Sequence, residues 1–176
     1  MRWFSLLPWP LVALLAACSP TYNWREFRLD DAPLVVQLPC KPEHASREVP
    51  LGEDTVPLRM TGCRVAGVTF AVGRLRLAPT APGGQRLAQW RAASLARLRA
   101  GEVREQPFQP KGSLGLPQSL RVDTVGQTTE GRPVRASAVW FARLAPDGLW
   151  LFHAAVYADA VPASVVDSFF NGLTLQ

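Results

Sequence analysis

Alternation of apolar and polar positions along the chain predicts several β-strands. Apolar residues occupy every second position from Val56 to Met60, and the same spacing returns from Val68 to Val72. A period of two is typical of a strand with one buried face. Because the turn-forming pair Ala66-Gly67 separates these runs, residues 55–76 are predicted to form a β-hairpin.

Other stretches have strand composition and end at turn-forming residues. They are residues 24–29, 34–38, 120–125, 133–143 and 149–157. Two intervening segments, 41–54 and 101–117, are rich in polar residues, Gly and Pro. This composition predicts loops there.

The apolar period changes to a helical one over residues 85–100, and Gly101 is expected to end that helix. Its apolar arc holds Leu87, Trp90, Leu95 and Leu98. A second, short helix is predicted over residues 162–173. Its inward side would consist of Val165, Val166, Phe169 and Phe170.

The order of these elements predicts an α+β fold. Tight turns between strands imply antiparallel pairing, and two amphipathic helices can cover one sheet. We therefore expect an antiparallel sheet of about six strands covered by two helices, in a single domain over residues 24–176. The chain has 176 residues, a length that can supply one sizeable core.

Residues 1–17 have the order of a secretory signal peptide. Arg2 comes first, an apolar stretch from Trp3 to Leu15 follows, and small residues precede Cys18. Pro8 and Pro10 interrupt a stretch that is already short for a membrane span of about 20 residues. This segment is predicted to be a leader that is removed.

Leu15-Ala16-Ala17-Cys18 resembles the lipobox of bacterial lipoproteins. The resemblance implies that Cys18 carries diacylglycerol and becomes the new N-terminus, so that acyl chains hold the protein on a membrane. A plain signal peptide with an incidental cysteine is the alternative. Residues 18–23 would be a short tether, and Ser19 favours the periplasmic face of the outer membrane. Trp24 would then stand close to the bilayer, as a core residue or at the interface.

If Cys18 is acylated, Cys40 and Cys63 remain as a pair in an oxidising compartment, which predicts a disulfide. The alternative is a zinc site formed by Cys40, His44 and Cys63, with His153 as a fourth ligand. No paired C-x-x-C or H-x-x-x-H spacing supports zinc. We therefore expect no metal and no other cofactor.

The element order resembles that of the PsbP-like proteins, extrinsic subunits of photosystem II, and of a nuclear Ran-binding release factor. The closing segment GLWLFHAAVYADAVPASVVDSFFNGLTL also carries this resemblance. It implies the PsbP-like fold and binding or assembly of other proteins, without assigning any residue a role. The YNWRE and LPCKP segments are similar to uncharacterised lipoproteins of beta-proteobacteria.

The sequence has no recognisable catalytic motif. It lacks the G-x-S-x-G, H-E-x-x-H, Walker and G-x-G-x-x-G patterns. The net charge of +5 comes from scattered arginines, without the dense basic run that indicates nucleic-acid binding. His153 lies on a strand face with Leu151 and Ala155, where a structural role is expected. The sequence therefore favours a protein that is not an enzyme and does not bind nucleic acid.

Arg91 falls within the apolar arc of the first helix, so two roles are open to it. Its aliphatic stem can pack while the charged group reaches solvent, or the guanidinium can bind an anionic ligand.

The sequence leaves three functional hypotheses open. The first is a membrane-anchored, non-catalytic envelope protein that binds or helps to assemble a protein partner. The second is a small-ligand binding or carrier module with Arg91 as its anion-binding group, and the third is an enzyme with an unrecognised site.

Overall fold

The computed structural model describes residues 21–176. The predicted signal peptide and Cys18, the predicted site of lipid attachment, lie outside the described residues. The fold is α+β, as the sequence predicted, with two helices and two antiparallel sheets. Within the described part of the chain, no helix is long and apolar enough to cross a membrane.

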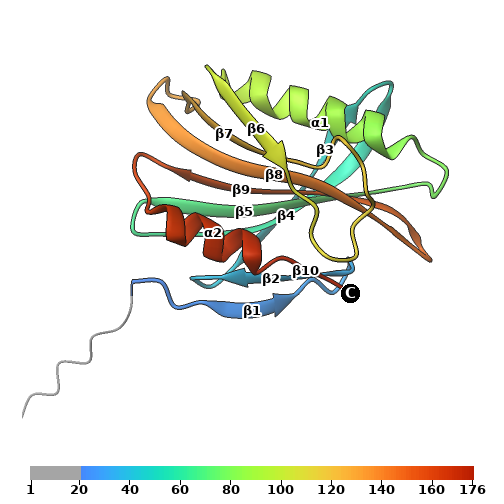
Figure 1. Cartoon of the computed structure of the whole chain (residues 1–176), viewed down its shortest axis with the longest axis horizontal. Helices are drawn as coiled ribbons and strands as arrows, with labels where there is room; N and C mark the ends of the chain where they lie inside the picture. Colours follow the sequence, from blue (N-terminus) through green and yellow to red (C-terminus); the bar gives the residue numbers. More distant parts are fainter. Residues whose placement is uncertain (1–20) are drawn as a thin grey trace, which may run out of the picture.

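The larger sheet has seven strands in the order β3-β4-β5-β9-β8-β7-β6. Every neighbouring pair in it is antiparallel. Its strands are β3 (Glu43–Leu51), β4 (Asp54–Val65), β5 (Val68–Leu77), β6 (Val103–Pro107), β7 (Leu120–Gln127), β8 (Pro133–Ala145) and β9 (Gly148–Ala158). Helix α1 (Gly83–Leu98) covers one face of this sheet (Figure 1).

The opposite face is covered by a smaller sheet and by helix α2 (Figure 1). The small sheet has the order β1-β2-β10, formed by β1 (Arg25–Arg28), β2 (Leu34–Leu38) and β10 (Thr174–Leu175). Helix α2 (Ala163–Asn171) buries Val166, Phe169 and Phe170, which confirms the inward side predicted for the second helix. The domain therefore has three layers, and the middle of the large sheet, β5, β9 and β8, is covered on both faces.

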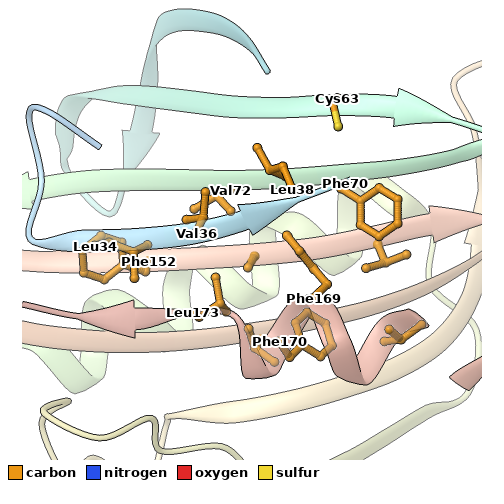
Figure 2. Close-up of a cluster of buried hydrophobic side chains, with 14 of the residues drawn as sticks. Leu34, Val36, Leu38, Cys63, Phe70, Val72, Phe152, Phe169, Phe170 and Leu173 are labelled. Carbon is orange, nitrogen blue, oxygen red and sulfur yellow. The ribbon is translucent and has the colours of Figure 1, made fainter. Parts of the chain in front are cut away.

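Two hydrophobic cores follow from this layering. One lies between the large sheet and the α2 side, where Phe70, Phe152 and Phe169 meet Leu34 and Val36 (Figure 2). The other lies under α1, where Leu87 and Trp90 pack on Leu75 and Leu151. Because successive residues of a strand point to opposite faces, β9 supplies both cores and is apolar along most of its length.

Two segments predicted to be loops contain strands. Residues 43–51 form β3 and residues 103–107 form β6, the two edges of the large sheet. Seven of the nine residues of β3 are exposed, so it lacks the buried alternation that reveals a strand. Backbone pairing with β4 holds β3 in place along its whole length.

Helix α1 ends earlier than expected. Its last helical residue is Leu98, and Arg99 adopts the left-handed conformation with φ 49°. The amide groups of Arg99 and Ala100 donate hydrogen bonds to carbonyls of the last turn, at 3.0 Å each. Arg99 therefore ends α1 in place of Gly101, although glycine is the residue that most easily adopts this conformation.

Cys40 and Cys63 form a disulfide, as predicted. Their Cα atoms are 5.9 Å apart, within the usual range for this bond. Cys40 follows β2 of the small sheet, while Cys63 lies on β4 and is buried. The disulfide therefore links the two sheets covalently.

Candidate ligand-binding pocket

A pocket of about 380 Å³ lies between the C-terminal half of α1 and the large sheet. Sites for small molecules usually have volumes of roughly 300–1,000 Å³ and mainly apolar linings. The pocket is lined by Arg47, Leu58, Met60, Thr69, Gly73, Trp90, Ser94, Arg97, Leu98, Gln127, Thr128, Thr129, Val134, His153 and Tyr157. Most of this lining comes from strands.

The floor of the pocket depends on a small residue in β5. Gly73 pairs with His153 across β5 and β9, and His153 pairs with Trp140 across β9 and β8. A Cβ atom at Gly73 would lie 3.2 Å from Cζ2 of Trp90 and 3.1 Å from Cδ1 of Leu58. Because residue 73 is glycine, the indole of Trp90 on α1 can pack directly against the sheet beside His153.

His153 is held between two indole rings. Its imidazole stacks on Trp140 with ring centroids 4.5 Å apart, and Trp90 meets it edge-on at 5.6 Å. Its Nε2 atom is buried and has no hydrogen-bond partner among the described residues. Burial lowers the pKa of His153 to about 4, so the ring is neutral at pH 7. The pocket floor thus offers a buried polar atom that a bound ligand could satisfy.

Tyr157 lies four residues further along β9, on the same face. It lines the pocket and also a second, wider hollow next to it. Burial raises the pKa of its phenol, which keeps the hydroxyl protonated at neutral pH. Tyr157 can therefore donate a hydrogen bond at the boundary between the two spaces.

Two arginines line the pocket, and no carboxylate does. Arg47 comes from β3 and Arg97 from the last turn of α1. Both are exposed, and neither has an ion-pair partner within residues 21–176. The charged side chains of the pocket lining are therefore both cationic.

Arg91 does not line this pocket. Its Nη1 lies 2.8 Å from Oε1 of Glu105 on β6, and its side chain is 22% exposed. The predicted packing of the stem with a solvent-facing charge fits this arrangement. The anion-binding role predicted for Arg91 stays a prediction and does not concern the α1 pocket, because its guanidinium pairs with Glu105 on β6. The sequence missed Arg47 because it lies on the unrecognised strand β3.

The second hollow adjoins the pocket through Thr69, Thr128, Val134 and Tyr157, which line both. Its volume is about 800 Å³ and its lining is more polar. Arg64, Arg132 and Arg135 line it together with Glu130 and Asp159. Arg132 pairs with Glu130 at 3.3 Å, so the remaining charged groups of this lining are Arg64, Arg135 and Asp159.

A polar network on the opposite face of the sheet has a structural role. Asp31 accepts hydrogen bonds at 2.8 Å from Arg59 and from the buried Arg74. Burial opposes the charge on Asp31, but the hydrogen bonds from Arg74 and then Arg59 outweigh it and lower its pKa. Arg74 also donates to Thr61, which contacts His44. The network connects the turn between β1 and β2 to β4 and β5.

This arrangement separates the proposed zinc ligands. His44 lies with Thr61 on the face that carries the small sheet, and His153 faces α1. The sulfur atoms of Cys40 and Cys63 are joined to each other. Within residues 21–176 no three His, Cys, Asp or Glu side chains are grouped so that they could hold a metal ion.

Trp24 belongs to an aromatic cluster on the α2 side of the sheet. Its ring meets Phe70 edge-on at 5.7 Å and stacks on Tyr22 at 6.3 Å. The side chain is partly buried against the core, as a packing role requires. The start of the described chain is therefore fixed beside the first residues of β5.

The comparisons with known proteins found no match, neither to a family model nor to a curated protein or a solved structure.

Proposed function

We propose that the protein is a non-catalytic, lipid-anchored protein of the bacterial cell envelope that binds a small, mainly apolar molecule in the pocket under α1. The anchor rests on the lipobox around Cys18. Binding rests on one observation above all, the pocket of about 380 Å³ between α1 and the sheet, whose apolar interior includes Leu58, Met60 and Trp90.

The pocket favours ligand binding over partner assembly as the main role. Val125 and Leu144 are the large hydrophobic residues that stand out as strongly exposed on the described surface. They lie near opposite ends of β8, since Val125 pairs with Arg135 and Leu144 belongs to the hairpin with β9. An apolar patch on this protein that binds a protein partner would require such exposed residues to be contiguous.

Filling the pocket tests this proposal. The experiment uses the full chain, purified after its natural processing and reconstituted in nanodiscs of neutral phosphatidylcholine. The probe is a brominated long-chain alcohol, whose bromine quenches tryptophan fluorescence only at short range. Trp90 lines the pocket, and we expect saturable quenching that a Trp90→Phe variant loses.

Ser94→Phe should abolish this quenching, because Ser94 lines the pocket and phenylalanine would fill it. Ala93→Phe is the matched control, since Ala93 is exposed on the same helix and lies outside the lining. Circular dichroism checks that both variants fold. Equal quenching in the wild-type chain, Ser94→Phe and Trp90→Phe would show that the probe binds elsewhere, and the proposal would be abandoned.

A further inference from the structure

The mouth of the pocket has an unbalanced charge that narrows the class of ligand. Arg47 and Arg97 reach it from two separate elements, β3 and α1. Other arginines around α1 are neutralised: Arg86 pairs with Asp54, and Arg91 pairs with Glu105. Two unpaired guanidinium groups at the mouth of an apolar pocket are suited to a carboxylate or a phosphate.

The volume of the pocket limits the apolar part of the ligand. A space of about 380 Å³ holds roughly a dozen groups of the size of a water molecule, at about 30 Å³ each. One acyl chain of moderate length fits such a space. Trp90, Leu58 and Met60 would contact that chain.

The position of the adjoining hollow fits a ligand that comes from a membrane. Thr69 and Tyr157 pair across β5 and β9 and line both spaces. The next residue of β5, Phe70, packs against Trp24, so the described chain starts at this same end of the domain (Figure 1). If Cys18 carries the lipid anchor, the adjoining hollow lies at the end of the domain nearest to the bilayer.

We infer that the pocket binds a single-chain anionic amphiphile, with its acyl chain under α1 and its acidic head group between Arg47 and Arg97. This inference rests on the proposed ligand-binding function and adds the charge and form of the ligand to it. The head group can be the carboxylate of a fatty acid or the phosphate of a lysolipid, and both have the same electrostatic requirement.

Brominated probes that differ only in the head group test the inference in the same nanodiscs. The probes are a fatty acid, a lysophosphatidic acid and the corresponding neutral alcohol. We expect at least one anionic probe to quench Trp90 with a Kd about tenfold lower than that of the alcohol, as charge-assisted hydrogen bonds at a partly exposed site allow. The stronger of the two acids identifies the source, a free fatty acid or a phosphate-bearing lipid.

A double variant, Arg47→Gln with Arg97→Gln, should remove the preference for the anion and leave the affinity for the alcohol unchanged. Arg25→Gln with Arg104→Gln is the matched control, because these exposed arginines line neither the pocket nor the adjoining hollow, and it should retain the preference. Equal affinity for acid and alcohol in the wild-type chain would overturn the inference while the proposed pocket remains. If instead Ser94→Phe did not reduce the quenching by any probe, the proposed function itself would be overturned.

Discussion

The imidazole of His153 lies face to face with the indole of Trp140, with ring centroids 4.5 Å apart and ring planes 12° apart. The register of β8 and β9 places these residues directly opposite each other. The stack covers one face of the imidazole, and Nε2 has no hydrogen-bond partner among the described residues. This relationship makes His153 both a part of the pocket floor and a group that should respond to pH.

The stability of the protein should fall as the pH is lowered from 6.5 to about 4. The folded-state pKa of His153 is about 4 because the ring is buried, against 6.5 for an exposed histidine. Between these values the unfolded chain binds a proton that the folded chain does not, so acid favours unfolding. Up to roughly 3 kcal/mol should be lost across this window.

Urea unfolding at pH 7.5 and pH 4.5 measures this loss. His153→Phe retains an aromatic ring but cannot titrate, so it should remove most of the pH dependence. His44→Gln is the control, because His44 is exposed on the opposite face of the sheet and its variant should retain the wild-type response. An unchanged pH dependence in His153→Phe would contradict the role assigned to the buried ring.

Replacing both disulfide cysteines should weaken the contact between the two sheets. The bond closes a loop with a sequence separation of 23 residues, for which the chain-entropy model gives about 3 kcal/mol. Cys40→Ser with Cys63→Ser should lower the free energy of unfolding by about that amount, and a reducing agent should no longer change it. Mass spectrometry of the unreduced protein provides an independent check, since two free thiols would rule out the bond.

Loss of the Asp31 carboxylate should be costly because it leaves a buried cation without its ionic partner. Arg74 is 7% exposed, and its Nη2 lies 2.6 Å from Oδ1 of Asp31. Asp31→Asn should lower the free energy of unfolding by about 2–4 kcal/mol, measured by urea titration at pH 7. Glu130→Gln removes an exposed partner of Arg132 and should leave stability unchanged. Similar effects of the two variants would contradict the structural role of this network.

Gly73 should tolerate alanine poorly although it lies in a strand, where larger residues are favoured. The new methyl group would lie 3.1–3.2 Å from Leu58 and Trp90, so both side chains would have to shift. We expect a loss of about 1–2 kcal/mol and a changed emission maximum for Trp90. Gly115→Ala is the control, since nothing lies within 4 Å of the added atom. Equal stability of both variants would show that Trp90 does not depend on Gly73.

The elements that could be predicted from the sequence are those that bury one face. The period of Val56, Leu58 and Met60 reveals β4, and the paired phenylalanines of α2 mark its inward side, because burial imposes these patterns. The edge strands β3 and β6 could not be recognised in this way. They are mostly exposed and depend on backbone hydrogen bonds to β4 and β7, which leave little trace in the choice of side chains.

The pocket was less accessible to sequence reasoning than the fold. The strand face of His153 was predicted correctly, but its neighbours Trp90 and Trp140 come from α1 and β8. Arg91 stands out in the sequence because it lies in the apolar arc of its helix, whereas the arginines that line the pocket are exposed and have no such pattern. Which charges face a pocket depends on tertiary contacts, and the order of residues does not contain them.

The most direct test of the proposed ligand-binding role is a crystal structure of the protein with a brominated fatty acid, in which anomalous scattering locates the bromine atoms. We expect a strong bromine peak between α1 and the sheet, beside Trp90 and His153, with the carboxylate near Arg47 and Arg97. Bromine peaks confined to the outer surface, with an empty pocket under α1, would contradict it.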